Sequence, residues 1–480
     1  MHILNWASIS LSILLSVATA GHALLHQRSP SAALGWVAVC LVFPFMGPCL
    51  YFLFGINRVE TRAKKLEDRR PVSLINLENY EKAANIVSVT PSDLNLPVRF
   101  SEIAKISDKV AGFPLLAGNR VRILHNGEAA YPEMLNTIKT AQKTIYLTIY
   151  IFDTTPTGKR FIAALAGAVQ RGVDVRVIID GIGELYSMTR AGTKLKKAGV
   201  KVARFLPPRL IPPSVHINLR NHRKILIADG HTGYTGGINI GDRHLVETHK
   251  NKRSRIVDIH FRLTGPVVMQ LEQVFLEDWT FCTGEQIEPT PSLPVQSGNV
   301  LCRAIPDGPN EDINRLSTIL IGAISSARER ILIMTPYFLP SAEMISALKT
   351  AALRGIDVRI VLPLKNNLPF VQWASSNMLS ELIFWGVKIY YQPPPFVHSK
   401  LFLCDDHYAQ IGSANLDPRS LRLNFEFNVE LYDREVTETL SAHVEDSIRK
   451  STFITLASIE NRPLIIKVRD ALMWLFSSYL

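Results

Sequence analysis

One arrangement of residues occurs twice in this chain, and it constrains the fold more than any other feature. Residues 221 to 241 read NHRKILIADGHTGYTGGINIG, and residues 397 to 417 read VHSKLFLCDDHYAQIGSANLD. Each copy has His, any residue, Lys, four residues and Asp, with a Gly and an Asn at the same later distances. Chance alone gives the His, Lys and Asp spacing at about one start position in ten thousand, so two matched copies indicate a duplicated functional unit.

Each copy follows a strand–helix–strand segment of the same design. AQKTIYLTIYIF, FIAALAGAVQRG and VDVRVIID precede the first copy, and ARERILIMTPYF, ISALKTAALRG and IDVRIVLP precede the second. Such alternation is typical of α/β units with a largely parallel or mixed sheet. We therefore predict two tandem α/β domains, residues 116–287 and 300–455, related by a pseudo-twofold axis and joined by the Pro-rich linker 288–299.

The length and the cysteines fit this organisation. A chain of 480 residues exceeds one ordinary domain, and about two to three domains are expected. The five cysteines are scattered without CxxC spacing, which argues against a disulfide framework or a zinc site. We expect the catalytic part to lie in a reducing compartment.

Two long apolar stretches, 3–25 and 32–56, contain no Lys, Arg, Asp or Glu. Each is long enough to cross about 30 Å of hydrocarbon as a helix, and the short link HQRSPS makes them a hairpin. We predict that residues 1–58 form two transmembrane helices and that residues 59–115 form a connector. A cleaved signal peptide is the alternative for the first stretch, because SVATAG resembles a cleavage site, although no basic region precedes the apolar core.

Charge predicts the partner and the topology. The net charge of +11 favours an anionic partner, and the apolar N-terminal region favours a membrane with anionic phospholipid over nucleic acid. NRVETRAKKLEDRR, after the second stretch, holds six Lys or Arg, whereas the link holds only Arg28. The positive-inside rule then predicts a multi-pass membrane protein with a cytoplasmic catalytic region and both ends on that side.

The C-terminal segment RPLIIKVRDALMWLFSSYL places Ile465, Val468 and Leu472 on one helical stripe. Two interpretations of residues 456–480 stay open: an amphipathic helix in the membrane interface, or a helix docked on the soluble domain.

The repeated motif carries chemistry suited to phosphoryl transfer. Alternate side chains of an extended strand share a face, so His222 and Lys224 project together, as do His398 and Lys400. Two imidazoles brought together can divide covalent catalysis, one attacking while the other protonates the leaving group and later deprotonates the acceptor. The lysines would hold anionic oxygens, and this chemistry requires no metal and no other cofactor.

Four further polar residues complete the candidate site. Asn239 and Asn415 would donate hydrogen bonds to the phosphate oxygens. An attacking imidazole usually needs a carboxylate on its other nitrogen. Asp258 in RIVDIHFRLTGP and Glu426 in LNFEFNVEL are acidic residues inside apolar strand patterns, and we expect them to orient the histidines.

These motifs resemble the duplicated signature of the phospholipase D superfamily. The N-terminal hairpin and the segments TPYFLPS, LPLKNN, WASSNM and SANLDPRSLRLNFEFN resemble the bacterial cardiolipin synthases of that superfamily. The resemblance implies a phosphatidyl-histidine intermediate on His222, with His398 as general acid and then general base; symmetry in the sequence does not decide between them. It also implies a catalytic signature completed by Lys224, Lys400, Asp229 and Asp405, with Asn239 and Asn415 binding substrate.

The reaction implied by this resemblance passes a phosphatidyl group from one phosphatidylglycerol to the terminal hydroxyl of another, giving cardiolipin and glycerol in a bacterial inner membrane. The alternatives are a membrane-bound phospholipase D hydrolase, another phosphatidyltransferase or a nuclease, and a non-catalytic scaffold that binds anionic lipid. A nuclease has little use for the apolar hairpin, and a scaffold need not keep both histidines. The sequence leaves the oligomeric state open.

Overall fold

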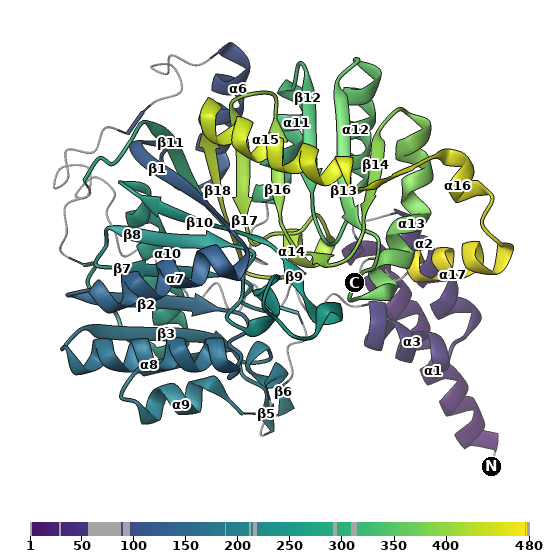
Figure 1. Cartoon of the computed structure of the whole chain (residues 1–480). Coiled ribbons are helices and arrows are strands. Elements are labelled where there is room, and N and C mark those ends of the chain that lie inside the picture. The colour runs from purple at the N-terminus through teal and green to yellow at the C-terminus, as the bar shows by residue number, and fades with distance from the viewer. Residues whose placement is uncertain are drawn as a thin grey trace. The chain divides into compact units, whose positions relative to one another are not determined.

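The computed structural model describes residues 2–27, 30–55, 88–89, 97–187, 189–210, 213–214, 218–290, 295–308, 314–475 and 477. The chain divides into two compact units, Met1–Asp68 and Arg69–Leu480, and each is described by itself (Figure 1). The basic cluster after residue 57, most of the predicted connector and part of the predicted linker lie outside the described residues.

The N-terminal unit contains α1 (His2–His26), α2 (Pro30–Val42), α3 (Met46–Leu50) and a π-helical turn (Tyr51–Gly55). The second apolar stretch is therefore not one continuous helix, because it breaks after α2 in the sequence FPFMGP, where prolines cannot donate helical hydrogen bonds. Among the described residues, one helical segment, Ser8–His26, is long and apolar enough to cross a membrane. The 13 residues of α2 rise about 20 Å, short of the hydrocarbon thickness, and the prediction of two spanning helices stays a prediction.

In the larger unit, 15 described strands form one sheet whose two halves repeat the same order. The first half runs β1 (Leu116–His125), β10 (Ile259–Thr264), β8 (Thr232–Gly236), β7 (Ile225–Ala228), β2 (Thr144–Ile149), β3 (Asp174–Asp180) and β4 (Lys201–Phe205). The second runs β11 (Val300–Asp307), β18 (Glu426–Tyr432), β17 (Tyr408–Gly412), β16 (Leu401–Cys404), β12 (Arg330–Met334), β13 (Asp357–Pro363), β14 (Lys388–Gln392) and β19 (Thr452–Ile454). The halves meet where β1 pairs antiparallel with β11.

Most helices of the larger unit lie between two strands of the same half. The described helices of this unit are α6 (Val98–Val110), α7 (Asn126–Thr140), α8 (Pro156–Gln170), α9 (Ala191–Lys197), α10 (Val267–Thr283), α11 (Arg315–Ser326), α12 (Ala342–Leu353), α13 (Pro369–Phe384), α14 (Pro418–Arg422), α15 (Arg434–Arg449), α16 (Leu456–Glu460) and α17 (Leu464–Leu475). The predicted strand–helix–strand repeats are β2–α8–β3 and β12–α12–β13, and in both the two strands pair in parallel. Both repeats could be predicted because each has two short apolar runs typical of strands on either side of a longer run typical of a helix.

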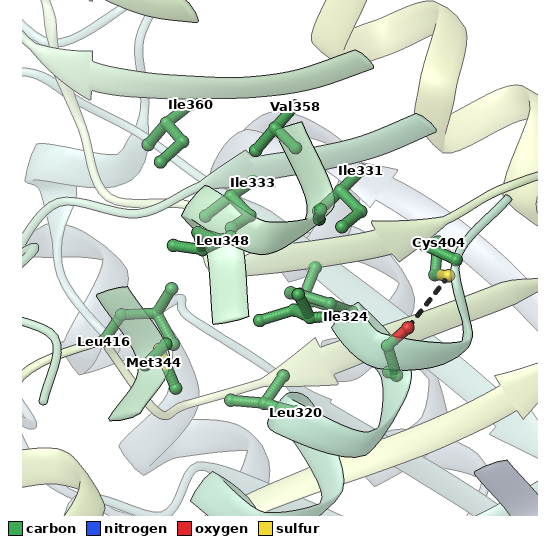
Figure 2. Packing of buried hydrophobic residues seen from close by; sticks show 14 of the residues in the cluster. Leu320, Ile324, Ile331, Ile333, Met344, Leu348, Val358, Ile360, Cys404 and Leu416 are labelled. Carbon is green, nitrogen blue, oxygen red and sulfur yellow. Dashed lines mark hydrogen bonds between the residues drawn. The ribbon is translucent and has the colours of Figure 1, made fainter. Parts of the chain in front are cut away.

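The core of the second half lies between its helices and the sheet. Figure 2 shows Leu320 and Ile324 of α11 facing Ile331 and Ile333 of β12, with the thiol of Cys404 donating to the carbonyl of Ala323 at 3.5 Å. This cysteine is therefore a core residue.

The end of the predicted connector also belongs to this core. Phe100 and Ile103 of α6 are fully buried in the same cluster as Leu316, and the hydroxyl of Ser107 donates to Glu430 at 2.8 Å. The predicted connector thus contains a helix that packs on the second half, whose other residues are far away in the sequence.

Candidate active site

The two copies of the motif meet at the junction of the two halves. His222 stands just before β7, and its backbone N–H donates to the carbonyl of Phe425 at 2.9 Å. His398 stands just before β16, and its backbone N–H donates to the carbonyl of Val257 at 2.8 Å. A short parallel pair of strands, β9 (Ile256–Val257) and β15 (Phe396–Val397), reinforces the second contact. Each histidine is therefore fixed to the half of the chain that does not contain it.

The two predicted orienting carboxylates lie on the histidines, and the pairing crosses between halves. Glu426 of the second half lies 3.0 Å from Nδ1 of His222, and Asp258 of the first half lies 2.8 Å from Nδ1 of His398. Both carboxylates are fully buried. With Nδ1 held in this way, Nε2 is the ring nitrogen that each histidine can present to a substrate.

The two lysines lie beside these histidines and are also buried. Nζ of Lys224 donates to the carbonyl of His222 at 2.6 Å, and Nζ of Lys400 donates to the carbonyl of His398. Burial lowers the pKa of Lys224 to about 7 and that of Lys400 to about 8. A bound phosphodiester anion would restore both charges, so the pair is suited to a site that holds phosphate.

The two histidine–carboxylate pairs differ electrostatically. Burial raises the pKa of Glu426 to about 7, although the charge of Lys224 opposes the rise. Burial likewise raises the pKa of Asp258, but the stronger combined effect of His398 and Lys400 lowers it below its usual range. Asp258 is therefore ionised beside His398, whereas Glu426 beside His222 is only partly ionised near neutral pH.

One position explains why the repeats read GGIN and GSAN. A Cβ atom at Gly237 would lie 2.3 Å from Oδ1 of Asp258. The carboxylate of Asp258 therefore occupies the space that a side chain at position 237 would need. The matching residue, Ser413, donates its hydroxyl to the Oε2 atom of Glu426 that also contacts His222. The sequence analysis missed Ser413, although this difference between the repeats was visible in the sequence.

The predicted asparagines lie in the loops that follow β8 and β17. Oδ1 of Asn239 accepts a hydrogen bond from the backbone of Ile151 at 3.1 Å, and Nδ2 of Asn415 donates to Ser420 at 3.1 Å. Both side chains are buried. The contact through Oδ1 leaves the amide N–H groups of Asn239 for a ligand, which fits the predicted phosphate-binding role.

A tyrosine that the sequence analysis missed also lines the site. The ring of Tyr150 stands edge-on to the ring of His222, with centroids 5.0 Å apart, and Nζ of Lys224 lies 5.7 Å from its centroid. The repeat gave no signal for this residue because TIYIF aligns with MTPYF, which has Pro336 at the matching place.

Asp229 and Asp405, predicted as members of the catalytic signature, do not lie with the histidines. Each follows the far end of a four-residue strand, seven residues or about 23 Å of extended chain from its histidine. Asp229 accepts hydrogen bonds from the backbone of residues 142–144 at 2.7–3.0 Å, and Asp405 does the same for residues 328–330. Asp405 also pairs with Arg99 at 3.1 Å. These bonds fix the starts of β2 and β12, while the catalytic role of both residues stays a prediction.

Comparison with known proteins agrees with this geometry. The family described as "Cardiolipin synthase, PLD-like domain" matches residues 134–279 and 320–448, and the family "Phospholipase_D-nuclease N-terminal" matches residues 14–55. A cardiolipin synthase of Geobacillus thermodenitrificans is 32% identical over 462 residues, covering 95% of this chain and 90% of that protein. The major cardiolipin synthase of Bacillus subtilis is 32% identical over 473 residues, covering 95% of each.

A solved structure, a phosphatidylserine synthase of Haemophilus influenzae, has the same fold. It aligns with a TM-score of 0.60 at 14% identity and covers 79% of this chain and 100% of its own. The fold is thus the predicted pair of phospholipase D-like α/β halves, and the N-terminal apolar helix indicates association with a membrane. On the strength of the near full-length relatives and the matched domain, the chain belongs to the phospholipase D-like cardiolipin synthases, a family of phosphatidyltransferases.

Proposed function

We propose that this chain makes cardiolipin and glycerol from two molecules of phosphatidylglycerol through a phosphatidyl group held on His222. The observation that carries the proposal is the crossed arrangement of two histidine–carboxylate pairs around two buried lysines. This arrangement supplies a nucleophile, a proton donor and positive charge for one phosphodiester.

In the first step, Nε2 of His222 attacks the phosphorus, and the bond from phosphorus to the glycerol oxygen breaks. His398 gives its proton to that oxygen, so glycerol leaves as a neutral alcohol. In the second step, the terminal hydroxyl of another phosphatidylglycerol attacks the phosphorus and gives its proton to His398, and the phosphorus–nitrogen bond breaks. Lys224 and Lys400 offset the charge on the phosphate oxygens throughout.

The unequal carboxylates support the choice of His222 as nucleophile. A general acid must be protonated before the first step; burial lowers the pKa of His398 to about 4, and the ionised Asp258 opposes this fall by stabilising the imidazolium form. A nucleophile must begin neutral. Glu426 is partly protonated near neutral pH, so it stabilises the imidazolium form of His222 less than Asp258 stabilises that of His398. The family resemblance suggests the same assignment.

Burial supports a lipid alcohol over water as acceptor, since the side chains of both histidines are only about one-tenth exposed. A hydrolase working by the same chemistry remains the second candidate. Incubation of the purified chain with phosphatidylglycerol, followed by mass spectrometry of lipids and glycerol, separates the two. Cardiolipin with an equal amount of glycerol supports the proposal, and phosphatidic acid as the main lipid product contradicts it.

The C-terminal helix supports a second contact with the membrane. On α17, Leu464, Ile465 and Leu475 are more than 60% exposed, while Asp470 is buried and pairs with Arg462 at 2.6 Å. The acidic residue thus faces the protein and the apolar stripe faces outward, the reverse of a helix in water. We therefore propose that α17 is docked on the domain and also lies against the membrane interface.

We further propose that the catalytic unit lies on the cytoplasmic face of a bacterial inner membrane. The basic segment after residue 57 supports this side. The halves predicted at 116–287 and 300–455 serve as one catalytic body, because neither half holds a complete histidine–carboxylate pair.

A further inference from the structure

Within the N-terminal unit, the second apolar stretch runs along α1 and then turns back. The hydroxyl of Ser16 donates to the carbonyl of Pro44 at 3.1 Å, so the middle of the stretch lies beside the middle of α1. The amide of Gln27 donates to the carbonyl of Gly55 at 2.6 Å, so the end of the stretch lies beside the link from which it started. In Figure 1, α1 extends beyond α2 and α3 toward its first residue.

The returning segment is packed against both helices. Tyr51 is buried, its hydroxyl lies 2.8 Å from Nδ1 of His22 on α1, and its ring contacts Trp36 of α2 with centroids 5.5 Å apart. At the start of α3, a Cβ atom on Gly47 would lie 2.3 Å from the carbonyl oxygen of Val39, so only glycine permits this close approach. The reversal is therefore built into the packing of the unit.

The turn itself has the chemistry of a membrane interior. Phe43, Phe45 and Met46 are more than half exposed, which would be unfavourable in water. Part of the backbone of the turn is nevertheless paired, which lowers the cost of placing it in hydrocarbon: the N–H of Phe43 donates to Val39 at 3.1 Å, and the N–H of Gly47 donates to Phe43 at 2.6 Å. Proline has no N–H, and Ser16 satisfies the carbonyl of Pro44. The link after α1, in contrast, reads QRSPS.

We propose that residues 30–55 form a re-entrant wedge, entering and leaving the hydrocarbon on one side, and that α1 alone crosses it. From Gln27 to Ser16 the helix rises about 17 Å, roughly half of a 30 Å hydrocarbon layer. From Ser16 to His2 it rises about 21 Å more, which carries it to the opposite surface. The turn would then lie near the middle of the bilayer.

This arrangement reverses one expectation from the sequence. Two spans would put the start of the chain on the same side as the catalytic unit, whereas one span and a wedge put them on opposite sides. Arg28 in the link then lies on the same side as the basic segment after residue 57, and the positive-inside rule places both in the cytoplasm. The distribution of basic residues is thus consistent with the wedge that the contacts of Ser16 and Gln27 indicate.

Labelling of single introduced cysteines tests the topology in the full-length chain. His2→Cys, Arg28→Cys and Asp68→Cys are each treated with a membrane-impermeant maleimide in right-side-out and inside-out vesicles, with the unsubstituted chain as background. We expect His2→Cys to react only in right-side-out vesicles, and the other two only in inside-out vesicles. Arg28→Cys and Asp68→Cys reacting from opposite sides overturns the wedge, and so does His2→Cys reacting from the side of Asp68→Cys.

Cross-linking provides a second test that depends on the contact itself. A permeant bis-maleimide about 10 Å long should join His22→Cys to Tyr51→Cys, because these side chains touch in the wedge. The matched control, Trp6→Cys with Tyr51→Cys, should not be joined, whereas two antiparallel spans would bring residues 6 and 51 to the same surface. Peptide mapping distinguishes these links from those of native cysteines, and a link in the control pair alone overturns the proposal.

Discussion

Replacing Asp258 by Asn should damage the chemistry of His398, which lies 140 residues away in the other half. The buried carboxylate lies 2.8 Å from Nδ1 of His398, and its removal leaves the imidazolium form without a partner. Loss of one member of a buried charged pair costs about 3–5 kcal/mol. At about 1.4 kcal/mol for each tenfold change, turnover of phosphatidylglycerol should fall about 150- to 5,000-fold.

Glu426→Gln should cost less and affect a different step. Glu426 is already partly protonated near neutral pH and shares Oε2 with Ser413, so the substitution removes mainly one hydrogen bond to His222. A hydrogen bond to a charged group contributes about 1.5–3 kcal/mol, which corresponds to about a 10- to 150-fold loss. Because His222 is the proposed nucleophile, the loss should fall on formation of the covalent intermediate.

A phosphatidyl ester of p-nitrophenol separates the two effects, because nitrophenolate leaves without a proton. With this substrate the first step of Asp258→Asn should recover to nearly the unsubstituted rate, and labelled phosphatidyl-His222 should accumulate because His398 deprotonates the acceptor poorly. Glu426→Gln should stay slow with either ester. Recovery by Glu426→Gln and not by Asp258→Asn would refute the crossed assignment, provided that both variants melt at the temperature of the unsubstituted protein.

Five further outcomes follow from the structure. Asp229→Asn should destabilise the fold by about 1–3 kcal/mol, seen as a lower melting temperature, while turnover per folded molecule stays within a few-fold, because its carboxylate accepts hydrogen bonds from the backbone at the start of β2. Below pH 7 Glu426, whose pKa is about 7, gains a proton and supports His222 less, so kcat/KM should fall there, and Glu426→Gln should flatten this limb of the pH profile. Above pH 8 Lys400, whose pKa is about 8, loses its charge, so KM should rise while kcat changes less. Treatment with a chelator should leave turnover intact, since imidazole and ammonium groups supply the chemistry; complete loss restored by one metal would contradict this. Ile465→Asp with Leu472→Asp should raise KM for lipid in vesicles several-fold but not for short-chain lipid in micelles, and equal effects on both would argue against contact of α17 with the membrane.

Much of the fold could be predicted because its signals are local. The strands β2, β3, β12 and β13 are short apolar runs next to helical ones, and the two strands of each repeat are neighbours in the sheet. The same holds for the pairs His222 with Lys224 and His398 with Lys400, since a spacing of two on extended chain fixes a shared face. Duplication then indicated that these pairs act together.

Other features depend on three-dimensional positions that the sequence pattern does not specify. Asp229 and Asp405 repeat with the histidines, yet each lies at the other end of its strand, where it binds the backbone at the start of the neighbouring strand. Tyr150 has no counterpart in the second repeat and so gave no signal. The second apolar stretch has the composition of a spanning helix, but its path depends on contacts of Ser16 and Gln27 with residues 28 positions away.

By itself, then, the sequence determined the repeated α/β units, the histidine–lysine pairs and the reaction class that they serve. Tertiary structure alone decided that Glu426 serves His222 across 204 residues, while Asp258 serves His398. The reason is physical: hydrophobic periodicity and strand alternation specify which face of an element a side chain occupies, but the partner on that face is set by how whole elements pack. In this chain the two halves join through β1 and β11, and that junction puts the acid of each half against the imidazole of the other.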